Sequence, residues 1–246
     1  MTWARTLLAA AVILSPVQTG RAQSGAAHLE ARPSAPTAGA ATGLTALGVS
    51  AARDAYLYVP SGYRPNHPAP LVVLLHGATQ SADLWSRSTT LFALADSMGL
   101  VLLMPNSQGR TWDLMLDGFG PDVALLDSAL TLVFRRCNID PKHIALAGFS
   151  DGATYALSLG VGNGDLFSSL IAFSPGYLAP AERRGTPRIF IAHGTDDRIL
   201  PINSTSRRIV PMLKQAGYIV VYHEFEGPHT VRPDQLREAL AWLLGT

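Results

Sequence analysis

One five-residue stretch, Gly148-Phe149-Ser150-Asp151-Gly152, constrains this 246-residue chain more than any other. An apolar run typical of a β-strand ends at Gly148, and a helix-like pattern begins directly after Ser150. A serine on such a turn has a strained backbone, and the residues two positions away must be small, because a Cβ there would collide with the strand or the helix. The two glycines meet this need, so the stretch predicts a nucleophilic serine, with a plain tight turn as the alternative.

The first 22 residues predict a secretory signal peptide. Arg5 gives them a positive start, Leu7 to Leu14 form an apolar run too short to span a bilayer, and Gly20-Arg21-Ala22 offers the small residues that a signal peptidase reads. A mitochondrial transit peptide is the alternative, because the stretch carries arginines and no acidic residue. We expect cleavage, a mature chain that begins near Gln23, and a secreted or periplasmic location.

The remainder divides into a linker and one domain. Residues 23–43 are rich in Ala, Pro, Ser, Thr and Gly and predict a flexible linker, because few apolar side chains offset the ordering entropy. Residues 44–246 are long enough for one domain with a sizeable core. The net charge of +1 and the lack of a basic run argue against nucleic acid as a partner. Cys137, the one cysteine, cannot form an intrachain disulfide and is expected to be buried or unreactive.

Strand and helix patterns alternate along the domain. The expected strands are 44–50, 54–59, 70–75, 100–104, 143–147, 170–173, 188–192 and 218–225, of which the first two form an antiparallel pair. The expected helices are one within 83–98 and those at 121–135, 151–159, 204–216 and 233–244. This alternation predicts the α/β class, with a doubly wound, mostly parallel sheet and helices on both faces. Such sheets bind ligands at the carboxyl ends of their strands.

Polar groups suited to acyl transfer follow four of the predicted strands. In chain order, these groups are His76-Gly77-Ala78-Thr79-Gln80, then Ser150, then His193-Gly194-Thr195-Asp196-Asp197, and finally Gly227-Pro228-His229-Thr230. The order serine, aspartate, histidine belongs to one fold among those on which catalytic triads have converged.

These stretches resemble the α/β-hydrolase superfamily, and more narrowly the phospholipase/carboxylesterase group and the secreted esterases related to polyhydroxybutyrate depolymerases and feruloyl esterases. The resemblance also rests on Leu74-Leu75 and on Pro201, and it covers Pro70 to the C-terminus. It implies a cofactor-free serine carboxylesterase with an α/β-hydrolase fold. The sequence departs from the family at Asp151, where many members carry Ala, Gln or His. A carboxylate there is unfavourable beside an oxyanion unless it turns outward.

The base that activates Ser150 is expected to be His229, because this histidine follows both the serine and the acid and lies after the last predicted strand. His76 and His193 lie in His-Gly turns, where we expect them to brace the loops by hydrogen bonding. The other histidines lie in the linker, in an early loop, at the far end of the strand before Ser150, or within a strand: His28, His67, His143 and His223.

The acid is Asp196 or Asp197, and the resemblance implies Asp197, because the family's aspartate lies four residues after the histidine of the turn. Its role is to hold the histidine tautomer and to stabilise the imidazolium. The oxyanion needs two preorganised N–H donors. One is that of Asp151, and for the other, in the loop after strand 70–75, Ala78 is the first choice and Thr79 the second.

The longest irregular connection, Met104 to Pro121, predicts a wall of the substrate pocket, with Trp112 and Thr79 as substrate-binding residues. The alternative is that Trp112 packs in the core. The short connections leave no room for a large cap domain, which favours short-chain or compact aromatic esters, and we expect no metal site. The same triad also serves acyltransferases and serine peptidases, and a non-catalytic binding protein of this fold is a further alternative. The sequence does not fix the oligomeric state.

Overall fold

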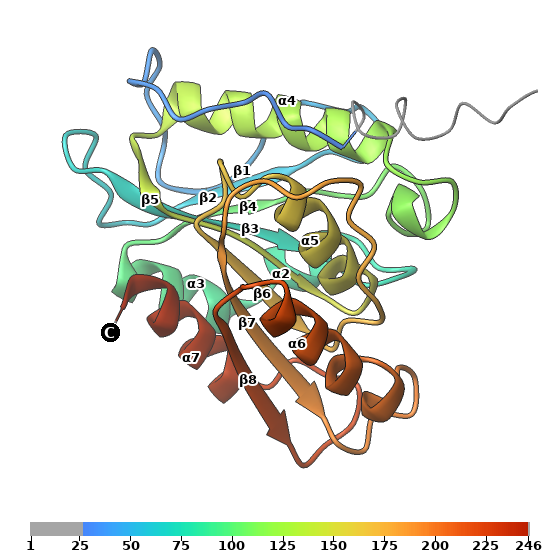
Figure 1. Cartoon of the computed structure of the whole chain (residues 1–246). Coiled ribbons are helices and arrows are strands. Elements are labelled where there is room, and N and C mark those ends of the chain that lie inside the picture. The colour runs from blue at the N-terminus through green and yellow to red at the C-terminus, as the bar shows by residue number, and fades with distance from the viewer. Residues whose placement is uncertain (1–26, 246) are drawn as a thin grey trace, which may run out of the picture.

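A single mixed sheet forms the centre of the computed structural model, which describes residues 27–245 (Figure 1). The predicted signal peptide lies outside the described residues. The strand order is β1-β2-β4-β3-β5-β6-β7-β8, in which β1, β2 and β4 pair antiparallel and all other neighbours are parallel. The strands are β1 (Gly43–Ala46), β2 (Tyr56–Val59), β3 (Ala69–Leu75), β4 (Val101–Met104), β5 (Ile139–Phe149), β6 (Ser169–Phe173), β7 (Arg188–Gly194) and β8 (Val220–Phe225). The predicted fold class is confirmed.

The helices connect the strands of this sheet. They are α2 (Asp83–Ser86), α3 (Thr89–Met98), α4 (Pro121–Arg136), α5 (Asp151–Gly162), α6 (Ser206–Gln215) and α7 (Pro233–Leu244), with short 3₁₀ turns η1 (Asp113–Met115) and η2 (Ile202–Ser204). The one helix predicted within 83–98 is two, because Ser88 is extended and caps the start of α3 by accepting the N–H of Leu91. Gly99 ends α3 in a left-handed conformation (φ 69°).

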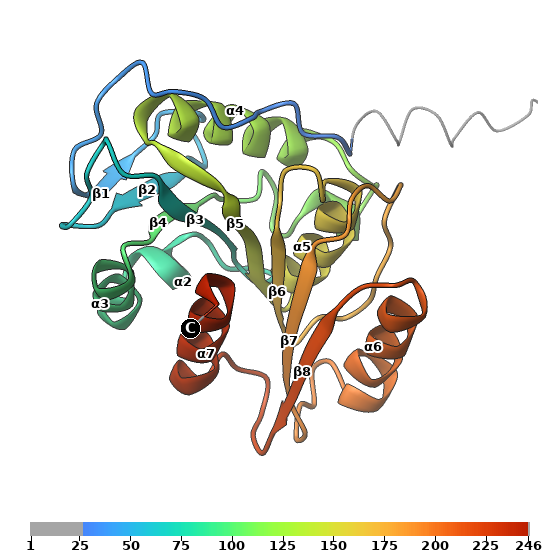
Figure 2. The ribbon, with the colours of Figure 1, turned by 60° about the vertical axis from the view of Figure 1, so that its left-hand side comes forward.

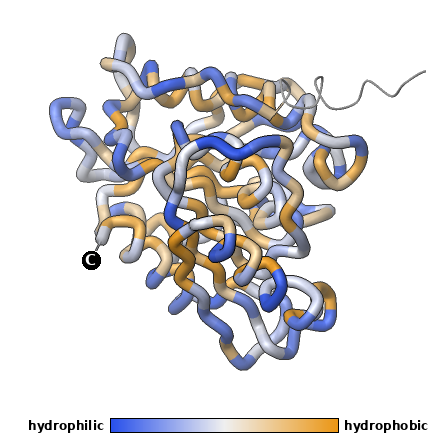
Figure 3. Tube along the Cα trace, in the orientation of Figure 1, coloured by the Kyte–Doolittle hydropathy of each residue, from blue (hydrophilic) through white to orange (hydrophobic). Residues whose placement is uncertain are grey.

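Helices cover both faces of the sheet (Figure 2), and a hydrophobic core lies on each face. Val72 and Leu74 of β3 belong to the core under α2, α3 and α7, whereas Leu71, Val73 and Leu75 belong to the core under α4, α5 and α6. Successive side chains of a strand alternate between faces, so a central strand buried on both sides must be apolar throughout. The central strands are accordingly among the most hydrophobic segments of the chain (Figure 3).

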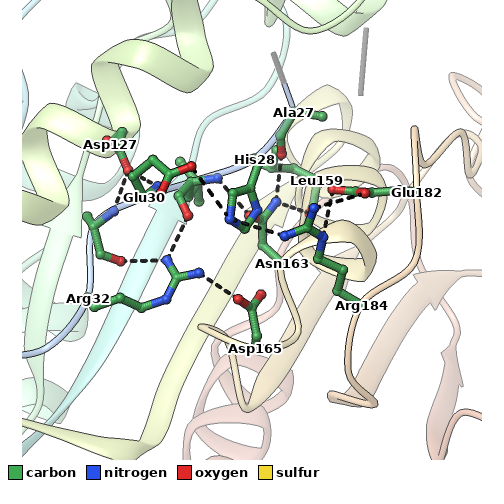
Figure 4. A network of polar contacts seen from close by, with 12 residues as sticks. Ala27, His28, Glu30, Arg32, Asp127, Leu159, Asn163, Asp165, Glu182 and Arg184 are labelled. Atoms are coloured by element: carbon green, nitrogen blue, oxygen red, sulfur yellow. Dashed lines mark hydrogen bonds and ion pairs between the residues drawn. The ribbon is translucent and has the colours of Figure 1, made fainter. Parts of the chain in front are cut away.

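The segment before β1 is not the flexible linker that its composition predicted, because it runs along α4 (Figure 1) and its first residues are held by a network of polar contacts (Figure 4). The side chain of Leu29 is fully buried, and its N–H donates to Asn163 Oδ1 at 2.8 Å. Asn163 Nδ2 in turn donates to the carbonyl of Ala27 at 2.8 Å. Asp127 of α4 accepts the next two backbone N–H groups, at 2.7 Å each. The side chains of Asp127 and Asn163 thus form hydrogen bonds with backbone groups of this segment, and the amino-acid composition of the segment gives no sign of these bonds.

No helix between residues 27 and 245 is long and apolar enough to cross a membrane.

The connection between β6 and β7 is short. The link from β6 to β7, residues 174–187, holds neither helix nor strand, so the described chain places no cap domain over the carboxyl ends of the strands.

Candidate active site

Ser150 occupies the sharp turn between β5 and α5 with a strained backbone, φ 57° and ψ −121°. Both flanking positions must be glycine, because any side chain there would clash with the backbone. A Cβ on Gly148 would lie 2.2 Å from the carbonyl oxygen of Gly152, and one on Gly152 would lie 2.5 Å from that of His76. The turn therefore has the geometry that the five-residue pattern predicted.

His229 and Asp197 meet at the same edge of the sheet, from the loops that follow β8 and β7. The Nδ1 atom of His229 lies 2.5 Å from Asp197 Oδ2. The Asp197 side chain is fully buried and the His229 side chain is 14% exposed. Asp196, the alternative acid, is exposed to solvent. The structure therefore brings Asp197 to His229, as the resemblance implied.

Asp197 is held as an ionised acceptor. Its Oδ1 accepts the N–H groups of Ile199 and Leu200, at 2.9 and 2.8 Å, and its Oδ2 faces the imidazoles of His229 and His193. Burial by itself raises the pKa of Asp197, but the hydrogen bonds from Leu200, His229 and Ile199, together with the charge of His229, outweigh it and leave the pKa below its usual value. A buried carboxylate with this many donors keeps its charge.

The residue before Ser150 contacts His229 directly. The Ser150 N–H donates to the carbonyl of Phe173, at the end of β6, at 2.9 Å, and the ring of Phe149 lies 4.7 Å from the imidazole of His229. Among the described residues no hydrogen bond joins the Ser150 hydroxyl to His229. Catalytic hydrogen bonds in enzymes without substrate are often long and tighten when substrate binds.

The oxyanion donors predicted after β3 and β5 lie next to the serine. A Cβ on Gly77 would be 3.3 Å from the Cβ of Ser150, so the loop that carries Ala78 passes directly beside the nucleophile. Ala78 is exposed, whereas the N–H of Thr79 donates to the carbonyl of Arg110 at 2.7 Å. Thr79 is therefore wrong as an oxyanion donor, and its hydroxyl is bound to the Ala78 carbonyl at 2.7 Å.

The second predicted donor, the N–H of Asp151, lies at the first position of α5, where it has no acceptor within the helix. Its carboxylate turns toward residues 105–120, which we call the wall loop. There Asp151 Oδ2 accepts the hydroxyl of Thr111 at 2.6 Å. The outward orientation that a carboxylate needs at this position is therefore observed.

Trp112 does not line the site, and its prediction as a substrate-binding residue is wrong. The side chain is fully buried, its Nε1–H donates to the carbonyl of His76 at 2.8 Å, and its ring packs on Tyr155. His76 braces the same loop, because its Nδ1–H donates to the Gly77 carbonyl at 2.8 Å and its Nε2 accepts the N–H of Ser107 at 3.0 Å. Burial lowers the pKa of His76, so the ring is neutral.

A cavity of about 410 Å³ opens beside His229, between α2 and α7. Its lining residues include Gln80, Leu84, Trp85, Ser88, Phe149, Thr230, Val231 and Leu236. Trp85 is 4% exposed, and its indole N–H has no hydrogen-bond partner among the described residues. Sequence reasoning missed this aromatic wall. Its signal was the position of Leu84 and Trp85 just after the carboxyl end of β3.

Comparisons with known proteins agree with this geometry. The family described as Esterase PHB depolymerase matches residues 54–178, about half of the chain, and Phospholipase/Carboxylesterase matches residues 123–244. A bifunctional acetylxylan esterase/xylanase of Neocallimastix patriciarum is 31% identical over 61% of this chain and 22% of its own length. The chain spans 22–53% of the length of the curated relatives it matches.

Solved structures share the fold at lower identity. A fluorophosphonate-binding serine hydrolase of Staphylococcus aureus superposes with a TM-score of 0.69 at 14% identity, over 83% of this chain and 99% of that one. A ferulic acid esterase of Anaeromyces mucronatus gives 0.59 at 18% identity, over 76% and 84%. With the match over residues 54–178 and a serine elbow, a buried aspartate and a histidine at one edge of the sheet, the chain belongs to the Esterase PHB depolymerase family and has the α/β-hydrolase fold.

Proposed function

We propose that this protein is a serine carboxylesterase that hydrolyses short-chain or compact aromatic carboxylic esters through an acyl-enzyme on Ser150. The observation that carries the proposal is the buried Asp197 carboxylate 2.5 Å from Nδ1 of His229, at the strand edge that also carries the strained Ser150 turn. An aspartate in this position fixes the proton on Nδ1, which leaves Nε2 free to act as a base.

Acylation begins when His229 Nε2 takes the hydroxyl proton of Ser150 as Oγ bonds to the ester carbonyl carbon. The carbonyl oxygen becomes an oxyanion, which accepts the N–H groups of Ala78 and Asp151. Each such donor is worth about 3 kcal/mol of transition-state stabilisation. Asp197 stabilises the His229 imidazolium. The bond between carbonyl carbon and alkoxy oxygen then breaks, and the alkoxide takes the proton from Nε2 and leaves as the alcohol.

Deacylation repeats these steps with water. His229 Nε2 takes a proton from a water molecule whose oxygen attacks the acyl carbon, and the same two N–H groups hold the second oxyanion. When the bond to Ser150 Oγ breaks, the serine recovers its proton from the imidazolium. The products are the carboxylic acid and the free enzyme.

The substrate size follows from an open site. The described link from β6 to β7 adds no cap domain, and the cavity beside His229 has a partly aromatic lining that includes Trp85 and Phe149. Each buried methylene contributes about 0.8 kcal/mol, so a long chain gains little once its first carbons are seated in an open cleft. The two esterases above are named for acetylxylan, an ester with a short acyl group, and for ferulic acid, a compact aromatic acid.

Replacement of the nucleophile tests the proposal. Ser150→Ala should lower kcat by on the order of 10⁶ and abolish labelling by a fluorophosphonate probe, because the three residues act as a unit. A probe that still labels the Ser150→Ala protein would refute the assignment of the nucleophile.

A series of p-nitrophenyl esters tests the substrate class. We expect kcat/KM to peak at short or compact aromatic acyl groups and to fall beyond about eight carbons, because only buried methylenes add binding energy. Trp85→Ala should reduce the rate with the preferred ester more than with acetate. A rate that rises steadily to long chains would contradict the proposed cleft.

We also propose that the chain is exported and cleaved after Ala22, because residues 1–22 carry the pattern of a signal peptide. Cleavage there would leave the docked segment at residues 27–42 intact. Mass spectrometry of exported protein should show a mature chain that begins near Gln23. Exported protein that retains Met1 would refute cleavage.

A further inference from the structure

A second histidine, which is fully buried, contacts the same carboxylate oxygen of Asp197 as His229. His193 belongs to β7, and its imidazole is fully buried. Its Nε2 atom lies 3.1 Å from Asp197 Oδ2 and 2.9 Å from the carbonyl oxygen of Leu200. Its Nδ1 atom lies 2.7 Å from the hydroxyl oxygen of Ser206, the first residue of α6.

These contacts fix the protonation of the ring. Nε2 of His193 faces two acceptors, so it carries the proton and donates. Nδ1 then has a free lone pair and accepts the Ser206 hydroxyl proton. Burial lowers the pKa of His193 more than the Leu200 carbonyl and Asp197 raise it, which keeps the ring neutral. Ser206 thus selects the tautomer in which His193 donates to the acid.

We propose that His193, oriented by Ser206, is a positioning residue for the acid Asp197. The inference rests on the proposed function. Oδ2 of Asp197 accepts from His193 as well as from His229, while Oδ1 is held by two backbone N–H groups. The neutral His193 donor holds Oδ2 toward His229 without adding charge, and it draws part of the carboxylate's hydrogen-bonding capacity away from the imidazolium.

The other charged groups near this chain of contacts are few. Glu224 of β8 pairs with His193 in register, and its carboxylate is bound by Arg207. Asp196 and Arg198 flank the acid in sequence and are exposed to solvent. Surface groups of this kind are screened by water and salt. Loss of the buried His193 donor should therefore dominate the response of His229 in the variants below.

Two substitutions separate positioning from packing. In His193→Gln the amide nitrogen is as many bonds from Cα as Nε2 of histidine, so a donor to Asp197 is retained. In His193→Asn the amide nitrogen matches Nδ1 instead, so that donor is lost while a polar side chain remains. We expect His193→Asn to lower kcat about tenfold, with KM within about twofold, because the loss of the hydrogen bond that orients the Asp197 carboxylate outweighs its stronger interaction with the imidazolium.

The pH profile gives a readout that a packing role would not move. Without the His193 donor, Asp197 stabilises the protonated imidazole of His229 more strongly. The acid limb of kcat/KM for a p-nitrophenyl ester should therefore move to higher pH in His193→Asn and stay near that of wild type in His193→Gln. Equal kcat and equal acid limbs in the two variants would overturn the proposal.

A third comparison uses the acid itself. Where Asp197 has already been replaced by asparagine, His193→Asn should change kcat by less than about twofold, because residues acting through one another are not additive. A further tenfold loss would show that His193 acts independently of the acid. If His193→Asn does not fold, Ser206→Ala tests the proposal instead, because without the Ser206 hydroxyl the tautomer of His193 is less strongly fixed. Its acid limb should move in the same direction by less, and an unchanged limb would overturn the proposal.

Fluorophosphonate labelling separates this inference from the proposed function. If the wild-type protein neither hydrolyses the ester nor reacts at Ser150, the proposed function fails. If the wild-type protein does both and His193→Asn has the wild-type kcat and acid limb, only the positioning role fails.

Discussion

Two loops at the carboxyl edge of the sheet each have a buried aspartate, within the loop or just beyond its end, and the pKa values of the two aspartates are shifted in opposite directions. The acid loop, residues 195–201, follows β7 and carries Asp197, and the wall loop leads from β4 to Asp122 in the first turn of α4. Both side chains are almost completely buried, since Asp197 is 4% exposed and Asp122 is 1% exposed. The pKa of Asp197 nevertheless lies below its usual value, whereas that of Asp122 is raised to about 6.

The difference comes from the partners of each carboxylate. Burial is the largest influence on Asp122 and raises its pKa, and the N–H groups of Gln108 and Asp113 offset only part of this. The neighbouring carboxylate of Asp113 raises the pKa further. Asp197 has two backbone donors and two imidazoles instead. Burial alone therefore does not decide whether a carboxylate stays charged, because the donors around it do.

The two loops also differ in what their carboxylates hold in place. Asp197 orients a histidine that takes part in the proposed chemistry. In the wall loop, Asp122 fixes the N–H groups of Gln108 and Asp113, and Asp113 Oδ2 accepts those of Gly120 and Asp122 where α4 begins. We therefore expect changes in the acid loop to alter kcat and changes in the wall loop to alter stability.

The largest effect should come from Asp197→Asn, which should lower kcat by on the order of 10⁴ while the protein remains folded, because His229 is left in the wrong tautomer. Asp196→Asn, one residue away and exposed, is the matched control and should leave kcat nearly unchanged. Steady-state kinetics on a short p-nitrophenyl ester would measure both. A larger loss of kcat in Asp196→Asn than in Asp197→Asn would assign the acid to Asp196.

In the wall loop, Asp122→Asn should lower the free energy of unfolding by about 2 kcal/mol, because an amide NH₂ would face a backbone N–H that now donates to a carboxylate oxygen. The kcat of the folded variant should stay within about threefold of wild type, since Asp122 touches no reacting atom in the proposed mechanism. Urea unfolding followed by circular dichroism gives the first quantity. A kcat loss as large as that of Asp197→Asn would remove the distinction between the loops.

The Asp122 substitution also predicts a pH dependence with a definite sign. The pKa of Asp122 is about 6 in the folded protein and 3.8 in its ordinary state, so between these values the folded protein binds more protons than the unfolded chain. The stability of wild type relative to Asp122→Asn should therefore fall as pH rises from about 4 to about 6 and level off above. A relative stability that rises across that window would show that the carboxylate is held ionised, as in the acid loop.

A smaller loss of stability should follow from Trp112→Phe. The substitution removes the hydrogen bond to the carbonyl of His76 but keeps an aromatic ring against Tyr155. We expect a loss of about 1 kcal/mol with no change in the preferred acyl length. Thermal unfolding and the ester series check the two statements. A changed acyl preference would show that Trp112 contributes to the substrate pocket.

The sequence predicted the sheet and its chemistry because both leave local signals. Apolar strands, the glycines of the elbow and the polar groups after the strands can be read without contacts, and the structure places Ser150, Asp197 and His229 at one edge. The structure corrected what depends on distant partners. Thr79 is engaged by Arg110, Trp112 by His76, and residues 27–31 by the side chains of Asp127 in α4 and Asn163 just after α5. Contacts of this kind join residues that are far apart in the sequence, and amino-acid composition does not indicate them.

The smallest effect tests the contact between the wall loop and Asp151, the residue that follows the nucleophile. Thr111→Val removes the hydroxyl that donates to Asp151 Oδ2 at 2.6 Å and keeps the shape of the side chain. The freed carboxylate can then turn toward the oxyanion, where a negative charge at about 4 Å costs on the order of 1 kcal/mol in a watery site. We expect kcat to fall about threefold, with Thr111→Ser close to wild type.

Asp151→Asn provides the control for this contact, because it removes the charge and leaves the backbone N–H of residue 151 in place. In that background Thr111→Val should have almost no further effect on kcat, since no carboxylate remains to be turned away. If the threefold loss persists, Thr111 supports the wall loop itself and does not act through the charge. The wall loop would then influence catalysis by its shape alone, and the contrast with the acid loop, which acts through a charge, would be complete.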